Sequence, residues 1–365
     1  MDLKTALIVL GAVLFALVIR VFSQPPQMPE NTSKNVTVVA EDLDIPWEIE
    51  FLPNGDLLVT ERPGTLLRIE ANGNTTRKYE VEGVEHRGEG GLMGIARHPN
   101  FTENSYIYLY MTTEAEEGLQ NRVVRYKLEG KQLDSPETII GELPGASYHD
   151  GGRIEFGPDE KLYITVGDAT NEKWAQKTDI LAGKILRLNA NGSIPEDNPF
   201  NNSVYSYGHR NPQGLVWMES QLWATEHGRS GLRSGMDELN RIEKGKNYGW
   251  PDIEGNEKQE GMEMPKIHSG SDTTWAPAGA AYADGSIFFA GLRGSTLYEA
   301  EIEDGEVQKL GGHFQDQFGR LRAVVKGPNG NLYFTTSNTD GRGNPRTGDD
   351  KLLRMDPRLL EQDRN

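Results

Sequence analysis

Short apolar segments alternate with polar turns along most of the chain, and this alternation repeats. In one pattern, a turn rich in Gly, Asn and Asp precedes an apolar segment of strand length. Six copies place an apolar residue at equivalent positions 45 to 65 residues apart, namely Leu57, Ile107, Leu162, Leu222, Ile287 and Leu332. A second apolar segment follows each copy, at residues 66–70, 123–128, 185–189, 239–243, 297–302 and 352–356. Five of these six segments carry an Arg at the same place: Arg68, Arg125, Arg187, Arg241 and Arg354.

Each repeat unit therefore predicts a strand, a tight turn and another strand. A single meander of this kind cannot bury both of its faces, whereas six meanders packed around an axis can. The sequence predicts an all-β protein with a six-bladed β-propeller over residues 36–357. Residues 36–41 form a strand without a blade of their own, and we expect them to pair beside residues 350–356 and close the ring. A pair of β-sandwiches is the alternative architecture.

The first residues have a different pattern. Residues 6–19 carry no charge and are nearly all apolar, which is typical of an N-terminal hydrophobic targeting or anchor helix. We expect a signal peptide or signal-anchor at residues 1–23, a polar Pro-rich tether at 24–35 and a C-terminal tail at 358–365. The expectation is an exported protein on the periplasmic or extracellular side, attached to the membrane if the helix is not cleaved.

The composition of the chain excludes several classes of active site and partner. The chain has 365 residues and no Cys, which excludes thiolate metal sites, iron–sulfur clusters, Cys nucleophiles and a haem attached through a Cys-x-x-Cys-His motif. Its formal net charge is −17, so nucleic acid is not an expected partner, because phosphate binding needs clustered Lys and Arg. The 42 Gly suit turns that need positive φ and loops that approach one another closely.

Five polar, glycine-rich loops hold the candidate functional residues. A His in an open loop, such as His149, can act as a general base near neutral pH. Arg side chains can clamp an anionic ligand, and Arg320 and Arg322 are spaced to face one side of a strand. Backbone carbonyls and carboxylates suit Ca²⁺. The five loops are 86–99 with Glu89, 147–158 with His149, 205–217 with His209, Arg210, Asn211 and Gln213, 224–231 followed by 236–242 with Asp237 and Glu238 and by 247–251, and 319–328 with the Arg pair, to which Arg293 adds a third cation.

Several longer motifs occur together in a fixed order. They are SYHDGGRIEFGP, YSYGHRNPQGLVW, ATEHG, DELNRI, NYGWP, TWAPAG, GRLR and TSNTDGRG. In this combination the chain resembles the soluble PQQ-dependent aldose sugar dehydrogenases, which are similar to the soluble quinoprotein glucose dehydrogenases. The resemblance extends over about residues 36–357. It implies a six-bladed propeller that binds pyrroloquinoline quinone (PQQ) and Ca²⁺ and oxidises aldose sugars at C1 to lactones by hydride transfer to the quinone.

The resemblance also implies roles for individual residues. His149 would be the general base for the anomeric hydroxyl, and Arg210 would stabilise negative charge as the cofactor is reduced. The carbonyls of Gly228 and Arg229 would hold the catalytic Ca²⁺, while Glu238 and the backbone of Tyr248 would bind a second, structural Ca²⁺. The implied cofactor contacts are Glu89, Arg210, Asn211, Arg293, Arg320 and Arg322. Without a haem motif, the electrons would pass to a separate acceptor.

Two positions depart from the family pattern. Arg229 stands where the family has a Pro, and Glu89 stands where some members have a Gln, although an ionised Glu cannot donate a hydrogen bond. Two other functions remain open on the sequence alone. One is a non-enzymatic propeller ectodomain that binds a carbohydrate or a partner, because a fold does not determine a function. The other is a Ca²⁺-dependent propeller lactonase.

Overall fold

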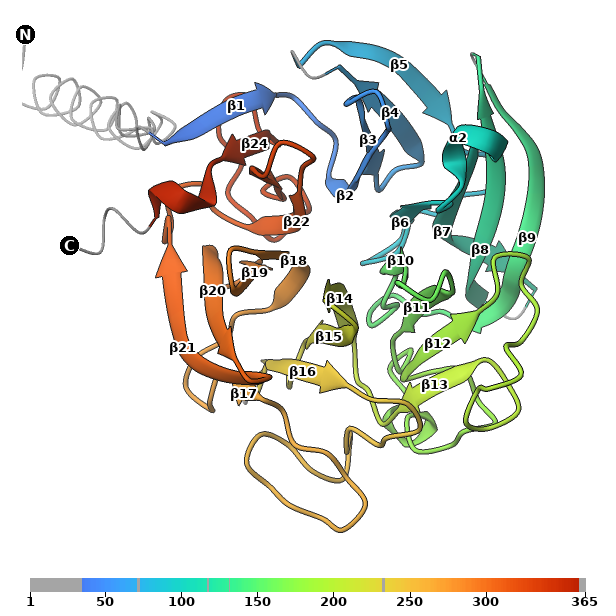
Figure 1. Ribbon diagram of the computed structural model, residues 1–365, viewed down its shortest axis with the longest axis vertical. Helices are drawn as coiled ribbons and strands as arrows, with labels where there is room; N and C mark the ends of the chain where they lie inside the picture. The colour runs from blue at the N-terminus through green and yellow to red at the C-terminus, as the bar shows by residue number, and fades with distance from the viewer. Residues whose placement is uncertain (1–34, 71–72, 117, 131, 232–233, 361–365) are drawn as a thin grey trace, which may run out of the picture.

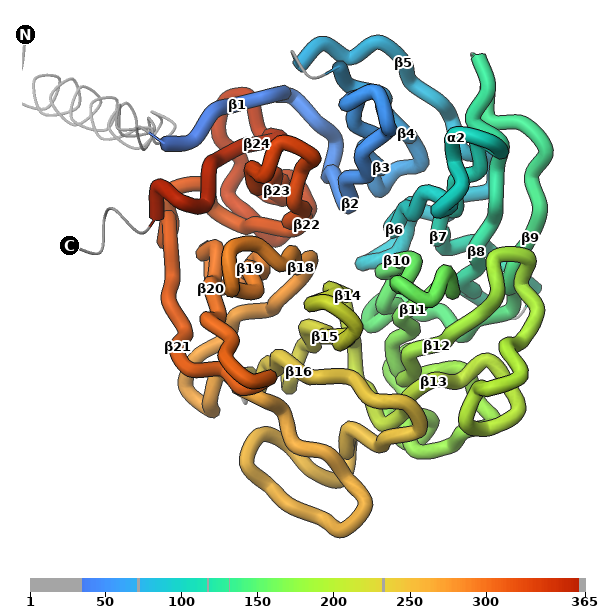
Figure 2. Tube along the Cα trace, viewed as in Figure 1, coloured from blue at the N-terminus to red at the C-terminus, as the bar shows by residue number. Residues whose placement is uncertain are grey.

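The computed structural model of the protein describes residues 35–70, 73–116, 118–130, 132–231 and 234–360. Six four-stranded sheets stand around a central axis, each packed against its two neighbours (Figures 1 and 2). All strand pairs within the sheets are antiparallel. The predicted all-β six-bladed propeller is therefore confirmed. The expected targeting helix and nearly all of the tether lie outside the described residues.

Five blades take their strands in chain order, and the first strand of each lies nearest the channel. Blade 1 contains β2 (Pro46–Phe51), β3 (Leu57–Glu61), β4 (Thr65–Ile69) and β5 (Thr75–Glu80), and blade 2 contains β6 (Leu92–Arg97), β7 (Tyr106–Ala115), β8 (Gly118–Glu129) and β9 (Gln132–Pro144). Blade 3 contains β10 (Ile154–Phe156), β11 (Leu162–Val166), β12 (Lys184–Leu188) and β13 (Val204–Tyr207), and blade 4 contains β14 (Pro212–Met218), β15 (Gln221–Glu226), β16 (Glu238–Ile242) and β17 (Ile267–His268). Blade 5 contains β18 (Pro277–Ala283), β19 (Ser286–Gly291), β20 (Thr296–Glu303) and β21 (Glu306–His313). The described helices are the one-turn α2 (Phe101–Asn104) and two 3₁₀ turns, Glu172–Trp174 and Pro357–Leu359.

The sixth blade joins the two ends of the described chain. It consists of β22 (Leu321–Lys326), β23 (Leu332–Thr336), β24 (Leu352–Met355) and β1 (Val36–Ala40). Strand β1 pairs with β24, with Val36 opposite Met355 and Val38 opposite Leu353, which confirms the predicted closure. The packing continues to Leu360, which is buried in the core of this blade, so it extends past the boundary expected at residue 357.

The sequence repeats correspond to the second and third strands of the blades. The recurring Arg of the third strand lies opposite the residue that follows the apolar marker of the second strand. These cross-strand pairs are Leu58 with Arg68, Tyr108 with Arg125, Tyr163 with Arg187, Trp223 with Arg241 and Tyr333 with Arg354. In the fifth blade, Phe288 faces Glu299 instead. The register is therefore the same in all six blades.

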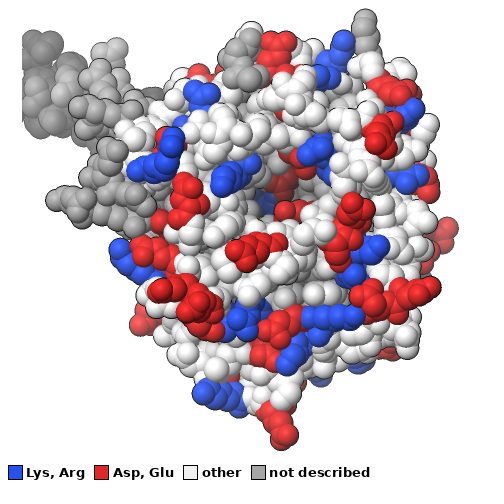
Figure 3. Space-filling model, in the orientation of Figure 1, with Lys and Arg blue, Asp and Glu red and all other residues white. Residues whose placement is uncertain are grey.

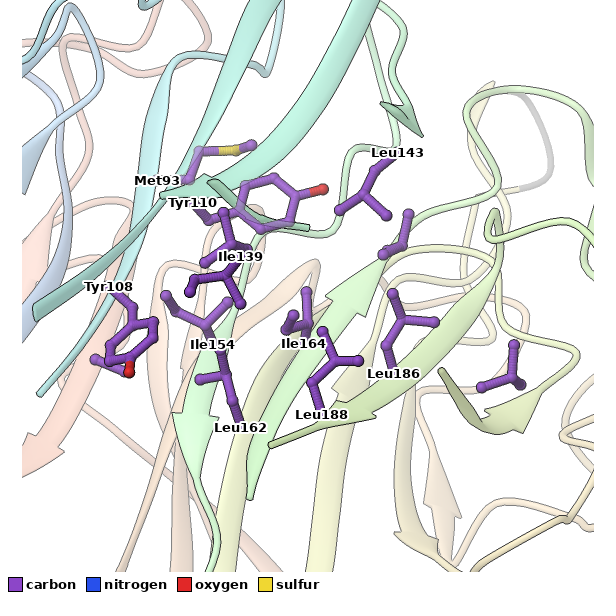
Figure 4. Close-up of a cluster of buried hydrophobic side chains, with 14 of the residues drawn as sticks. Met93, Tyr108, Tyr110, Ile139, Leu143, Ile154, Leu162, Ile164, Leu186 and Leu188 are labelled. Carbon is purple, nitrogen blue, oxygen red and sulfur yellow. The ribbon is translucent and has the colours of Figure 1, made fainter. Parts of the chain in front are cut away.

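Hydrophobic side chains fill the spaces between neighbouring blades. Between blades 2 and 3, Met93 and Tyr110 lie in one buried cluster with Ile154, Ile164 and Leu186 (Figure 4). Burial of such apolar surface is the main favourable contribution to folding, and dense packing holds the blades rigidly against one another. The loops at the ends of the blades consequently have fixed positions. Among the described residues, no helix is long and apolar enough to cross a membrane.

The channel opens into a cavity at each end. The first strands of all six blades contribute to a cavity of about 470 Å³ at their C-terminal ends. A second cavity of about 500 Å³ is lined by the loops that lead into these strands and by the loops between the second and third strands of the blades. In the orientation of Figure 1, the surface is hollowed at the centre of the disc, and charged side chains of both signs surround the hollow (Figure 3).

Candidate active site

The loop-lined cavity collects most of the residues that the sequence singled out. Eleven of them are in its wall: Glu89, His149, Arg210, Asn211, Gln213, Gly228, Arg229, Asp237, Arg293, Arg320 and Arg322. They come from loops or strand ends of five blades, and the propeller alone brings them together. Glu238 and Tyr248 are not part of this wall.

His149 has the surroundings of an oriented base. Its Nδ1 lies 2.8 Å from Oδ1 of Asp168, and the indole Nε1 of Trp250 donates to Oδ2 of the same carboxylate at 2.9 Å. An imidazole whose Nδ1–H is held by a carboxylate leaves Nε2 as a proton acceptor. The three residues come from separate loops, and the imidazole is mostly buried at 17% side-chain exposure.

The backbone at His149 is held in an unusual conformation. Its φ is 65°, in the left-handed region that costs a residue with a Cβ about 1 kcal/mol or more. The N–H of His149 donates to Oε2 of Glu89 at 3.3 Å, and its carbonyl accepts from Ala169 N at 3.2 Å. A Cβ on Gly167 would lie 1.9 Å from that carbonyl oxygen. Neighbouring loops thus fix the direction in which the imidazole points.

Deep in the cavity, several buried donors have no partner. Nε of Arg210, Nδ2 of Asn211 and Nε2 of His227 are buried and make no hydrogen bond to described residues. An unsatisfied buried polar group costs about 1–3 kcal/mol, so the Arg210 and Asn211 donors favour a ligand that supplies acceptors. Arg210 also donates to Oγ of Ser230 at 3.0 Å and stacks over Trp250, with 5.3 Å between Cζ and the ring centre.

The cavity wall is strongly cationic although the chain is acidic. It contains six Arg and two carboxylates, Glu89 and Asp237. Burial, with repulsion from Arg62 and Arg320, lowers the pKa of Arg322 to about 9. Arg320 is paired with Asp340 at 2.8 Å. The excess of positive charge in a largely desolvated space predicts an anionic ligand.

Glu89 is ionised and committed to other side chains. Burial opposes its ionisation, but the positive charge of His227 at acid pH, the ion pair with Arg342 and the His149 N–H lower the pKa of Glu89 to about 2. Its Oε1 lies 2.5 Å from Arg342. Glu89 therefore does not replace the donor that a Gln would offer to a ligand; it fixes Arg342 and the loop that carries His149.

The loop with Gly228 and Arg229 is anchored by a buried carboxylate. Asp237 accepts from the N–H groups of Gly228, Trp275 and Ala276 at 2.7–2.9 Å. These bonds hold the loop against the cavity, so that its backbone is in place to offer carbonyl oxygens to a hard cation. The carbonyl of Arg229 also accepts from Gly235 N at 3.3 Å, and the Arg229 side chain pairs with Glu254 at 2.8 Å.

Glu238 and Tyr248 lie together behind the cavity rather than in it. Glu238 faces Glu226 across β15 and β16, and burial together with the Glu226 charge raises the pKa of Glu238 to about 8. Tyr248 stacks on His209, with ring centres 4.8 Å apart, and His209 Nδ1 lies 2.8 Å from Glu226. Among the described residues, no three His, Asp or Glu side chains form a metal-binding group, so a cation there needs backbone oxygens.

Sequence reasoning missed several residues of the site. Asp168 lies two residues after the end of β11 in one repeat copy, and the carboxylate that breaks the apolar pattern there was the available signal. Arg342 belongs to the TSNTDGRG motif. Its ion pair with Glu89, 253 residues away in the sequence, could not be predicted from either local segment. His227 and Trp250 belong to motifs that were recognised as wholes, and only the fold shows that both lie at this site.

The fold and the site define a propeller protein with an oriented base and a cationic ligand pocket at one end of its channel. Residues 43–354 match the Glucose / Sorbosone dehydrogenase family, and the chain belongs to this family, as the resemblance in its motifs indicated. Aldose sugar dehydrogenase YliI of Escherichia coli is 31% identical over 89% of this chain and 93% of its own length. Quinoprotein glucose dehydrogenase B of Acinetobacter calcoaceticus is 33% identical over 63% of this chain and 55% of its own.

Solved structures agree with this assignment. The PQQ-bound aldose sugar dehydrogenase of Streptomyces coelicolor is 40% identical, with a TM-score of 0.81 over 88% of this chain and 97% of its own. A putative glucose dehydrogenase of Thermus thermophilus is 41% identical, with a TM-score of 0.82 over 88% of this chain and 99% of its own.

Proposed function

We propose that the protein is a PQQ- and Ca²⁺-dependent dehydrogenase that oxidises aldose sugars at C1 to lactones. The observation that carries this proposal is the meeting of the His149–Asp168 pair with unpartnered cationic donors in one cavity. A base suits the removal of a hydroxyl proton, and the donors suit an anionic redox cofactor. The relatives and structural neighbours that are named as dehydrogenases support the same proposal.

The donor set fits a quinone that carries carboxylates. Arg320 and Arg322 can bind carboxylates bidentately, and Arg293, which is exposed at the mouth, adds a third cation. Arg210 and Asn211 offer the buried unpartnered donors that quinone oxygens would satisfy. When bound, PQQ supplies the hydride acceptor, and the protein binds and orients it.

His149 performs the proton chemistry in this proposal. Its Nε2 accepts the proton of the anomeric hydroxyl while the C1 hydride leaves, because removal of the proton increases the electron density at C1. Asp168 stabilises the imidazolium that forms, and Trp250 holds Asp168 in place. Cζ of Arg210 lies 5.3 Å from the centre of the Trp250 ring. Trp250 therefore contacts both the charge-stabilising cation Arg210 and the carboxylate that orients the base.

Calcium belongs to the same proposal. The carbonyls of Gly228 and Arg229 would contribute oxygen ligands beside the cofactor, where a hard cation balances carboxylate charge and polarises a carbonyl. Glu238, with the Tyr248 backbone, would hold a second, structural Ca²⁺, which would also neutralise the two facing carboxylates. An acceptor outside this chain takes the electrons, and export to the periplasmic or extracellular side remains part of the proposal.

The test is reconstitution of the purified full chain. We expect PQQ with Ca²⁺ to give sugar-dependent dye reduction with a panel of aldoses, and EGTA added before PQQ to prevent it. Absence of turnover above the cofactor-free protein across the panel contradicts the proposal. If sugar lactones are hydrolysed without PQQ, the protein is a lactonase. If an equilibrium titration shows no PQQ binding, the protein is a non-enzymatic propeller that binds a carbohydrate or another partner.

A further inference from the structure

We propose that Tyr148 is the surface on which the sugar ring packs while its anomeric hydroxyl meets His149. This inference rests on the proposed function and names the part of the substrate that the site recognises, the apolar C–H face of an aldopyranose. Tyr148 is an aromatic residue at the mouth of the cavity, and the proposed cofactor contacts assign no role to it.

Tyr148 differs from the other exposed apolar residues in its position. Three large hydrophobic side chains are markedly exposed among the described residues: Tyr148 at 48%, Ile194 at 47% and Met264 at 40%. Exposure of single apolar residues is ordinary, and Ile194 and Met264 are not in the cavity wall. Tyr148 is in that wall, directly before the base in the chain. Its ring therefore faces a space that a ligand can enter.

The ring is fixed by a bridge from two other blades. The guanidinium of Arg342, in the β23–β24 connection, lies 5.4 Å from the centre of the Tyr148 ring. Arg342 is held by Oε1 of Glu89 at 2.5 Å, and Oε2 of Glu89 accepts from the His149 N–H at 3.3 Å. One carboxylate thus connects the residue that holds the ring to the backbone of the base. The distance between ring and base is set by the same network.

Close contact between loops keeps this network rigid. Glu89 N donates to the carbonyl of Ser147 at 2.9 Å. Gly88 has φ +63°, and a Cβ there would lie 2.1 Å from that same carbonyl oxygen. Only glycine permits this approach, which brings Glu89 beneath the loop that presents Tyr148. An aromatic ring already held in place loses little conformational entropy when a ligand packs on it.

The residues of the cavity wall differ in how deeply they are buried. Arg322 and Arg210 are 4% and 6% exposed and lie at the bottom, so the anionic cofactor belongs there. Tyr148 and Arg342 form the mouth, where the substrate enters last. Sugars carry hydroxyls on their edges and C–H groups on a ring face, and an electron-rich aromatic ring attracts such C–H groups. Binding sites combine aromatic walls with a few polar contacts in this way.

The test compares three variants of the full chain in the presence of PQQ and Ca²⁺. For Tyr148→Ala we expect the KM for aldopyranoses to rise about tenfold, with kcat within threefold and unchanged PQQ affinity. Tyr148→Phe keeps the ring and should keep KM within threefold. Met264→Ala removes an exposed apolar side chain outside the cavity and should match the unmodified protein.

A second measurement is independent of turnover. Saturation-transfer NMR with a methyl glycoside, which cannot be oxidised at C1, should show saturation transfer from the protein to the C–H protons of the sugar ring. In Tyr148→Ala this transfer should be at least fivefold weaker. An unchanged KM and unchanged transfer in Tyr148→Ala overturn the proposal, as does an equal loss in Tyr148→Phe, which would assign the contact to the hydroxyl. A fall in kcat without a change in KM would assign Tyr148 to the positioning of His149. If the unmodified protein does not oxidise sugars, the proposed function fails, and the NMR result alone decides on Tyr148.

Discussion

The two ends of the propeller channel are built by the same six blades, but one end has balanced charges and the other an excess of positive charge. At the C-terminal ends of the first strands, three carboxylates and three cations line the cavity: Glu48, Glu50 and Glu155 with Arg97, Arg153 and Lys326. Arg153 pairs with Glu48, and Arg97 lies 3.5 Å from Glu50. At the loop-lined end, six Arg face two carboxylates.

This difference distinguishes a structural cavity from a binding site. Buried charges that are paired within the protein need no ligand, and the strand-lined end satisfies most of its own charges. At the loop-lined end Arg229, Arg320 and Arg342 have carboxylate partners. Buried donors of Arg210 and Asn211 have no partner among the described residues, and a ligand with acceptor atoms would offset the cost of leaving them unsatisfied. The volumes, about 470 and 500 Å³, do not separate the two ends, whereas the excess of Arg over carboxylates at the loop-lined end does.

The largest expected effect is the loss of the base. His149→Ala should lower kcat by about 10³-fold, because general-base catalysis contributes about 10²–10⁴-fold, while PQQ affinity persists. Steady-state dye reduction and a PQQ titration measure the two quantities. His98→Ala is the matched control, since His98 directly follows β6 at the other end of the channel; its kcat should stay within twofold. Retained turnover in His149→Ala would exclude His149 as the base.

Removing a deep cation should weaken cofactor binding without lowering the stability of the cofactor-free protein. Arg322→Met should weaken PQQ binding about 10- to 100-fold, from the ~1.5–3 kcal/mol of a hydrogen bond to a charged group. Because burial and like charges lower the pKa of Arg322 to about 9, its removal should not lower the Tm of the cofactor-free protein. Arg97→Met at the opposite end should leave the PQQ Kd unchanged. Equal effects of both substitutions on Kd would mean that charge balance does not locate the site.

A smaller effect is expected from the support of the base. Trp250→Phe keeps the ring beneath Arg210 but removes the N–H that donates to Asp168. Asp168 then loses a hydrogen bond that holds it against the imidazole, so kcat should fall about fivefold, from the ~1 kcal/mol of a typical hydrogen bond, with PQQ affinity unchanged. The control is Trp217→Phe, since Trp217 lines the other cavity and its Nε1 has no partner among the described residues. An unchanged kcat in Trp250→Phe would show that this hydrogen bond does not support the base.

The smallest effect is at the strand-lined end and concerns stability alone. Burial, with repulsion from Glu50, raises the pKa of Glu155 to about 8. The folded state then keeps a proton that the unfolded state has released, so this group lowers stability as pH rises from about 4.5 to 8. Glu155→Gln should raise Tm by about 2 °C at pH 8.5, with no change at pH 4 and none in turnover. A lower Tm at pH 8.5 would show that the ionised carboxylate stabilises the fold.

Much of the fold could be predicted because the repeat is local. Alternating apolar residues around Leu57 and Leu162 define strands, and the recurrent Arg68 and Arg187 mark their partners at a constant register. Six such units can bury their faces only by packing radially. The same local information identified His149 and Arg210, because each stands in a glycine-rich loop that interrupts the repeat.

The remaining residues of the site depend on distances that no sequence window contains. Asp168, Trp250 and His149 meet from three loops separated by up to 101 residues (250 − 149). Glu89 pairs with Arg342 because the closing blade returns to the start of the ring.

Local sequence patterns specify the blades, their number and order, and the chemical types of the candidate residues, because β-strand periodicity and turn chemistry act over a few residues. The tertiary structure decided which of these residues share a cavity and which, like Glu238 and Tyr248, lie behind it. It also decided which charges remain unpaired, since pairing is a property of atoms brought together by packing between blades. For that reason the site could be identified at one end of the channel only after the ring was closed.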